Sequence, residues 1–126
     1  LTLKEFMKKL KCHCGAFEAN IKVSKNLEKI IRCNCSLCKR KGALMSMVKN
    51  EDFMIVKGGD KLNLYKFHTN VANHYFCSIC GIYTHHNPRS NPAMTGFNLG
   101  CIDSIDTFEL KNILINDGYN HPLDKK

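Results

Sequence analysis

The chain has 126 residues, of which 44% are hydrophobic and 24% charged, a composition typical of one globular domain with a modest core. No stretch approaches the roughly 18 apolar residues of a membrane helix, and residues 1–11 lack the apolar run of a signal peptide. The formal charge is +8, with 19 Lys and Arg scattered among 11 Asp and Glu, which favours a solvated basic surface over a dedicated nucleic-acid site.

The chain begins with a segment of helical spacing and then turns to short strands. Leu3, Phe6, Met7 and Leu10 lie three or four residues apart, which predicts a short helical lead-in over residues 1–10. Strands are predicted at residues 17–23, 30–31, 43–48, 53–56, 62–67, 71–76, 82–85, 94–99 and 108–115. Gly58-Gly59-Asp60 marks a turn, and the two prolines of residues 87–92 mark a loop. Many short strands with turns between them predict an all-β domain.

Cysteine is the unusual component, with eight residues in a chain of this length. Seven of them fall into three tight groups, at Cys12–Cys14, Cys33–Cys38 and Cys77–Cys80. Cysteines so close together cannot easily bridge each other, whereas a short turn can present two thiolates to one cation. Without a secretory signal we expect the protein in the reducing cytoplasm, where dense cysteine is typical of metal sites. The sequence therefore predicts zinc rather than disulfides.

The spacing predicts two zinc ions of different kinds. Three thiolates lie within six residues, at Cys33, Cys35 and Cys38. One loop can supply all three and leave the fourth zinc position to water or substrate, as in catalytic sites. The remaining pairs, Cys12/Cys14 and Cys77/Cys80, together make a closed four-thiolate site that contributes folding energy. Spacing also leaves open a second division, in which Cys12 and Cys14 join two members of the triplet.

The other cysteine and the histidines carry weaker signals. We interpret Cys101 as a small buried side chain, although a fourth ligand or reactive thiol beside the open zinc is the alternative. His85 and His86 are interpreted as surface residues at a strand end, with a proton shuttle as the alternative. His74 has no distinguishing context. With both zinc sites as thiolates, the net charge falls to about +5.

The cysteine motifs together resemble a known family. They are Cys12-x-Cys14-Gly15, Cys33-x-Cys35-x-x-Cys38, Cys77-x-x-Cys80-Gly81 and the closing segment Asn98-Leu99-Gly100-Cys101-Ile102-Asp103. In order and spacing they resemble the glutathione-dependent formaldehyde-activating enzymes, and Pro88-Arg89-Ser90-Asn91-Pro92 is similar to the branch that includes centromere protein V. The resemblance runs over residues 11–120, which we take as a single domain between the lead-in 1–10 and a tail, 121–126.

The resemblance implies a fold, two metal sites and an activity. The fold is a β-tent, several short coiled antiparallel sheets organised around a structural zinc. That zinc is implied on Cys12, Cys14, Cys77 and Cys80, and a labile, catalytic-type zinc on Cys33, Cys35 and Cys38. The implied reaction joins glutathione and formaldehyde into S-hydroxymethylglutathione, a carbon–sulfur lyase reaction run in reverse.

Basic residues near the triplet are candidates for holding the thiol substrate. Lys39, Arg40 and Lys41 follow the triplet directly, and they and Arg89 are expected to receive the carboxylates of a small thiol such as glutathione. No membrane partner is expected, and nucleic acid is not favoured. The alternative function is a non-enzymatic zinc module that binds a protein or nucleic-acid partner.

Overall fold

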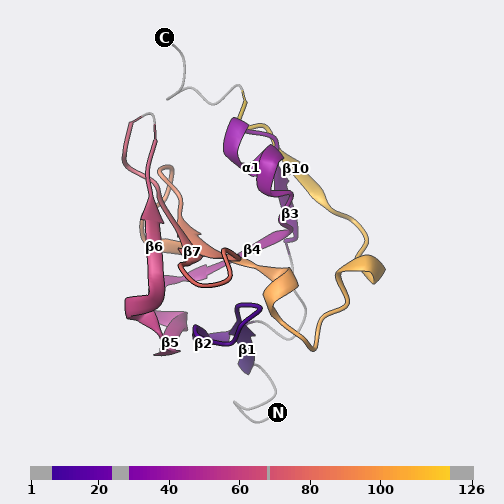
Figure 1. Cartoon of the computed structure of the whole chain (residues 1–126). Helices are drawn as coiled ribbons and strands as arrows, with labels where there is room; N and C mark the ends of the chain where they lie inside the picture. The colour runs from indigo at the N-terminus through magenta and orange to yellow at the C-terminus, as the bar shows by residue number, and fades with distance from the viewer. Residues whose placement is uncertain (1–6, 24–28, 68, 120–126) are drawn as a thin grey trace.

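The strands of this protein form two sheets (Figure 1). A computed structural model describes residues 7–23, 29–67 and 69–119. Within those ranges the chain forms ten strands, a single α-helix and short 3-10 turns. The prediction of an all-β fold is confirmed.

The smaller sheet has three antiparallel strands in the order β1-β2-β5. They are β1 (Met7–Lys11), β2 (Glu18–Lys22) and β5 (Phe53–Lys57). The predicted helical lead-in is wrong where it is described, because residues 7–11 pair with β2 from Met7↔Lys22 to Lys11↔Glu18. Leu10 is fully buried between the exposed Lys9 and Lys11, so the alternation of a strand prevails over helical spacing. Leu3 and Phe6 lie outside the described residues.

The larger sheet has seven strands in the order β10-β3-β4-β9-β8-β7-β6. They are β3 (Ile31–Cys33), β4 (Met45–Lys49), β6 (Leu62–Tyr65), β7 (Asn73–Cys77), β8 (Tyr83–Asn87), β9 (Met94–Asn98) and β10 (Leu114–Asn116). Neighbours are antiparallel except β10 and β3, which are parallel. In Figure 1, β6 and β7 stand on the left, β3 and β10 on the right, and β4 crosses between them.

The last predicted strand is shorter than expected. Residues 108–115 were predicted to be extended throughout, but Thr107–Glu109 form a 3-10 turn and β10 begins only at Leu114. Asn112 lies between them at φ 59°, a left-handed conformation that interrupts regular pairing. The prediction failed because the apolar spacing of this segment does not reveal where its backbone turns.

One core joins the two sheets. Phe17, Leu10 and Ile21 come from the smaller sheet and its flanking turn, Phe97 and Leu99 come from β9 and the residue after it, and all five are fully buried. Burying one such side chain contributes about 1.5–3 kcal/mol. The cluster includes Cys12 and Cys77, so the first and third cysteine groups lie at the edge of the core.

The helix α1 (Ser36–Lys41) carries the end of the cysteine triplet. Its N-cap is Cys35, whose Sγ accepts the N–H of Cys38 at 3.3 Å. It ends at Gly42, whose φ of 64° is the left-handed conformation that glycine adopts readily. No helix among the described residues is long and apolar enough to cross a membrane.

Candidate functional site

Four cysteines from two distant segments meet at the edge of the core. Their sulfur atoms, from Cys12, Cys14, Cys77 and Cys80, all lie within 4.8 Å of one another. The Cys12–Cys14 sulfur pair is 3.6 Å apart and the Cys14–Cys77 pair 3.7 Å. A tetrahedral zinc with bonds of about 2.3 Å requires sulfur separations of about 3.8 Å. All eight cysteines are free, so the donor set and spacing fit a tetrahedral metal ion.

A backbone turn follows each of the two cysteine pairs, and backbone N–H groups in the second turn stabilise the thiolate of Cys77. Gly15 (φ 79°) and Gly81 (φ 78°) follow the two cysteine pairs in the left-handed conformation, which reverses the chain after each. The backbone N–H groups of Cys80 and Ile79 donate to Cys77 Sγ at 3.5 and 3.4 Å and lower the pKa of that thiol.

The three-cysteine cluster is built on β3, the following loop and α1. The sulfurs of Cys33, Cys35 and Cys38 all lie within 4.8 Å of one another. Two hydrogen bonds favour the thiolate of Cys33: the Cys35 N–H and the Asn116 side-chain amide each donate to Cys33 Sγ at 3.5 Å.

The thiols of Cys33 and Cys38 differ in how readily they lose a proton. The neighbouring sulfurs of Cys35 and Cys38 hold the pKa of Cys33 far below its ordinary value, and the pKa of Cys38 is held far above by the sulfurs of Cys33 and Cys35 and by burial. Three adjacent thiolates repel one another, so the cluster retains a proton unless a cation takes its place. This is the electrostatic arrangement expected of a metal-binding group.

The C-terminal strand β10 supports the three-cysteine cluster, and this support was not predicted from the sequence. β10 pairs with β3 so that Asn116 lies opposite Cys33. A Cβ added at Gly118 would lie 2.5 Å from Cys33 Sγ and 2.9 Å from Cys35 Cβ, so only glycine fits there. Tyr119 N–H also donates to Asn34 Oδ1 at 2.9 Å. No sequence signal reveals this support, because it depends on a parallel pairing between residues more than 80 positions apart.

The grouping of the cysteines follows one of the two divisions that spacing allowed. Cys12 and Cys14 meet Cys77 and Cys80, not the triplet. Cys101 belongs to neither cluster. It is buried, its thiol donates to the Tyr83 carbonyl at 3.6 Å, and burial raises its pKa to about 12. The interpretation of Cys101 as a small buried side chain is therefore confirmed.

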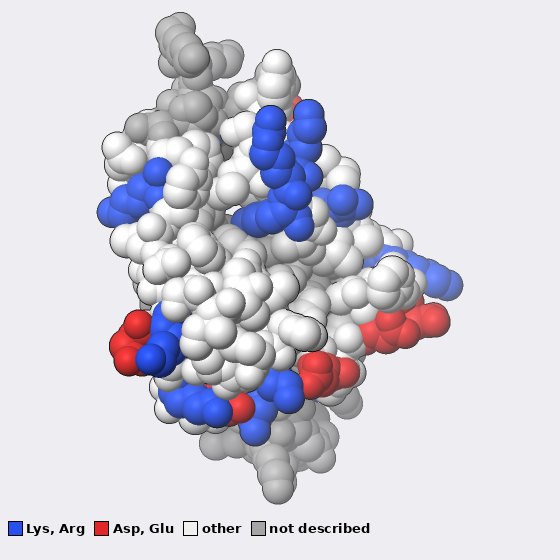
Figure 2. Space-filling model, viewed as in Figure 1, with Lys and Arg blue, Asp and Glu red and all other residues white. Residues whose placement is uncertain are grey.

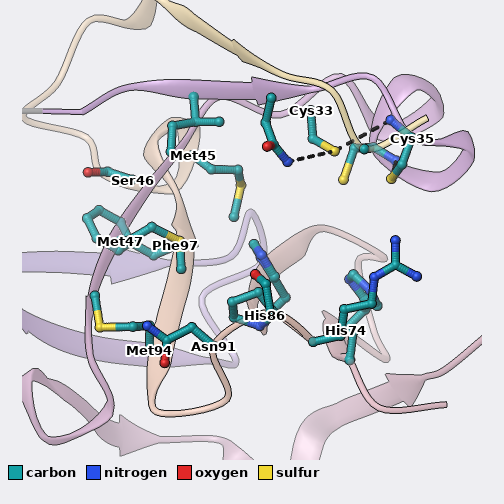
Figure 3. A pocket seen from close by; sticks show the side chains of 18 of the residues that line it. Cys33, Cys35, Met45, Ser46, Met47, His74, His86, Asn91, Met94 and Phe97 are labelled. Carbon is teal, nitrogen blue, oxygen red and sulfur yellow. Dashed lines mark hydrogen bonds between the residues drawn. The ribbon is translucent and has the colours of Figure 1, made fainter. Parts of the chain in front are cut away.

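A cavity of about 860 Å³ opens beside the three-cysteine cluster (Figure 3). Cys33 and Cys35 lie on one side of it, and His74 and His86 lie across from them. Its other end is largely apolar, lined among others by Met45, Met47, Val48, Met94 and Phe97. None of the four cysteines of the other cluster lines this cavity. The two clusters therefore differ in their surroundings: the four-cysteine cluster lies at the edge of the core, and the three-cysteine cluster faces a space large enough for a small molecule.

The four predicted basic residues do not lie together. Arg89 lines the cavity, as does Lys29, which the sequence did not single out. Lys39 and Arg40 are exposed on α1 and are not among the lining residues, and Arg40 Nη1 donates to the Ser36 carbonyl at 2.7 Å. Figure 2 shows Lys and Arg side chains gathered over the part of the surface where α1 and β3 lie. Arg89 is thus the predicted anion-binding residue that reaches the cavity.

In β8, His85 is buried and His86 is half-buried in the wall of the cavity, so their interpretation as surface residues is wrong. β8 lies between β7 and β9, and its successive residues Thr84 and His85, which point to opposite faces of the sheet, are both buried. His85 is 5% exposed and packs against Phe53 and Tyr75, with ring centroids 4.4 and 4.6 Å apart. His86 faces the cavity beside His74. Burial lowers the pKa of His85 and His74 to about 4 and of His86 to about 3.

Lys41 turns away from its two exposed basic neighbours. Its Nζ lies 3.3 Å from the centroid of the Tyr83 ring, a cation–π contact. Burial lowers the pKa of Lys41, while attraction to the sulfur of Cys38 opposes that shift. The positive end of this side chain is therefore held inside the protein next to the three-cysteine cluster.

Comparison with known proteins agrees with this architecture. The family model of the glutathione-dependent formaldehyde-activating enzyme matches residues 7–114. The chain belongs to this family. The crystal structure of a protein from Rhodobacter sphaeroides is 38% identical and superposes with a TM-score of 0.82, over 86% of this chain and 99% of that one. The family predicted from the cysteine motifs is confirmed, and the fold is shared with a solved relative.

Proposed function

We propose that this protein is a zinc-dependent carbon–sulfur lyase that makes and breaks the adduct between a small thiol and an aldehyde, with S-hydroxymethylglutathione as the type substrate. The observation that carries the proposal is the placement of Cys33, Cys35 and Cys38 in the wall of a cavity of about 860 Å³. Three ligands leave one position of a tetrahedral metal for a thiol, and the cavity provides the room for it. Family membership supports glutathione and formaldehyde as the reactants.

The two clusters are proposed to hold two zinc ions in different roles. Cys12, Cys14, Cys77 and Cys80 would hold a structural ion, because four protein sulfurs complete its coordination beside the core. The triplet would hold a labile ion. When bound there, zinc lowers the pKa of a thiol at its fourth position and so favours the nucleophilic thiolate. Eight free thiols suit the reducing cytoplasm, where we place the protein.

The residues of the chain bind and orient the two reactants. Arg89, in the cavity wall, would pair with a carboxylate of the thiol substrate, for which a guanidinium offers two parallel hydrogen bonds. The substrate sulfur is then held at the triplet with the aldehyde carbon beside it, and the entropy of their encounter is already lost on binding. In the addition the thiol S–H bond breaks, a C–S bond forms, and the carbonyl oxygen ends as a hydroxyl that carries the proton.

Exchange NMR tests this proposal directly. At equilibrium between glutathione, formaldehyde and the adduct, the protein should increase the exchange rate of the hydroxymethyl protons. A Cys35→Ser variant that retains its fold should not do so, because its triplet has lost one of three ligands. An unchanged rate with wild-type protein carrying both zinc ions would refute the proposal.

A second candidate function rests on the exposed basic residues of α1. Lys39 and Arg40 point to solvent at the end of a short helix, over the positively charged part of the surface in Figure 2. Such a surface can attract an anionic macromolecule. A non-enzymatic zinc module would use this face and would not need the cavity, which distinguishes the two proposals.

A further inference from the structure

Four buried polar atoms in the described part of the chain have no hydrogen-bond partner, and they lie together. They are Lys41 Nζ, His74 Nδ1, Tyr83 Oη and His86 Nδ1. The His74 and His86 rings stack with centroids 5.5 Å apart, and the Tyr83 ring lies 6.2 and 6.1 Å from them. A buried polar atom without a partner costs free energy, so four in one place require an explanation.

The fold makes a specific place for one of these rings. His86 lies opposite Gly96 in the β8–β9 pairing. A Cβ added at Gly96 would lie 2.3 Å from His86 Cε1, so the imidazole rests on a backbone that carries no side chain. Glycine inside a strand weakens it and often marks a close approach. The glycine that makes room for His86 therefore lowers the stability of β9.

The two histidines are suited to bind a neutral oxygen. Both line the cavity, across from Cys33 and Cys35 (Figure 3). Because burial lowers the pKa of His74 to about 4 and that of His86 to about 3, both rings are uncharged near neutral pH. A neutral imidazole offers one N–H donor and one acceptor nitrogen. The pair can therefore donate a hydrogen bond to a carbonyl oxygen and accept one from a hydroxyl.

His85 provides the contrast on the same strand. Its Nδ1 is 2.8 Å from Thr84 Oγ1, so it has a hydrogen-bond partner within the protein. Its ring packs among aromatic side chains and does not line the cavity. Two adjacent histidines thus differ in that one is satisfied by the fold and the other is left with an unpaired Nδ1 beside the cavity.

We propose that His74 and His86 are catalytic residues that bind the oxygen on the aldehyde-derived carbon of the adduct. This inference rests on the proposed function. As the sulfur attacks, the carbonyl π electrons move to the oxygen, and the imidazole N–H groups stabilise the charge that develops there. The proton that the thiol lost to solvent is replaced by a proton from solvent on this oxygen. The histidines neither gain nor lose a proton over the cycle.

A matched pair of variants tests the role of His86. His86→Leu removes the polar atom at the δ position, whereas His86→Asn keeps one there. In protein that carries both zinc ions, we expect His86→Leu to reduce kcat/KM for the adduct by about 10²- to 10³-fold, the usual effect of losing one oxyanion donor, and His86→Asn to recover much of this. Affinity for S-methylglutathione, which lacks the oxygen, should be the same in all three proteins. A folded His86→Leu protein with wild-type kcat/KM would overturn the inference.

A measurement on the wild-type protein does not require activity or a variant that folds. In protein with ¹⁵N-labelled histidine, a mixture of glutathione and formaldehyde, which contains the adduct, should shift the Nδ1 resonance of His74 or His86. S-methylglutathione should leave both unchanged. If the mixture shifts neither resonance, the inference is wrong even where exchange NMR detects catalysis. If the resonances shift but exchange is not accelerated, the oxygen site stands and the proposed function fails.

Discussion

Replacing Gly118 with Ala should release the zinc ion that we propose at the three-cysteine cluster without unfolding the protein. The new Cβ would lie 2.5 Å from Cys33 Sγ, 2.9 Å from Cys35 Cβ and 3.4 Å from the Cys35 backbone nitrogen. Since carbon and sulfur do not approach closer than about 3.5 Å, Cys33 Sγ must move by about 1 Å. A metal–ligand distance tolerates only about 0.2 Å. We therefore expect zinc affinity at the triplet to fall by at least the 10- to 100-fold that is typical of losing a supporting contact.

The assay is competition with a chromophoric chelator, which titrates the two ions in separate steps if their affinities differ. Only the weaker step should change in Gly118→Ala, because Gly118 contacts the triplet and not the other cluster. Gly59→Ala is the matched control, since a Cβ there would meet Ile55 at an ordinary 3.6 Å. Two unchanged steps in Gly118→Ala would refute the view that β10 holds the triplet in place.

Three further predictions concern folding, pH and partners. Cys77→Ser should prevent stable folding, since a structural zinc contributes on the order of 10 kcal/mol, whereas Cys35→Ser should fold and lack one zinc; equal circular dichroism melts would contradict this. The two adjacent histidines of β8 have pKa values of about 4 and about 3 instead of 6.5, so the unfolded state takes up protons first as the pH falls. The free energy of unfolding should therefore decrease as the pH falls from about 6.5 to about 4, by at most about 1.4 kcal/mol per pH unit for each histidine. Urea titrations at pH 7 and pH 5 measure this change, and an equal free energy of unfolding at the two pH values would refute the prediction. We expect duplex DNA to bind only weakly, with a log–log salt slope of about −0.9 per phosphate contacted; submicromolar binding at physiological salt that is lost in Lys39→Ala/Arg40→Ala would favour the alternative function.

Local patterns in the sequence were sufficient to predict most strands and the cysteine groups. β2 alternates buried Ala19 and Ile21 with more exposed neighbours, as its apolar spacing predicted. The cysteine turns are equally local, since two cysteines that lie two or three residues apart can already point their sulfur atoms toward one ion. Local sequence does not reveal which two turns bind the same ion. The four-cysteine cluster needs Cys12 and Cys77 to meet across two sheets, and spacing alone left that open.

The wall of the cavity could not be predicted, because it is assembled by strand order. His74, His86 and Gly96 come from three neighbouring strands, and only the register of β7, β8 and β9 places them in one row. The two β8 histidines were misjudged because adjacency to a proline-rich loop suggested an exposed end. The helix α1 was missed for a different reason: its N-cap is Cys35, not one of the usual capping residues. Gly42, in the left-handed conformation at its end, was the signal available.

The central claim is that a thiol binds as thiolate at the three-cysteine cluster, and the spectrum of the cobalt-substituted protein tests it most directly. The clusters supply four and three sulfur ligands, so glutathione should raise the number from seven to eight and strengthen the sulfur-to-cobalt absorption by about one seventh. The apparent affinity should rise with pH up to the pKa of the free thiol, because binding releases a proton. Cys35→Ser should show no such increase. If millimolar glutathione leaves the wild-type spectrum unchanged, the triplet does not bind a substrate thiol and the account is wrong.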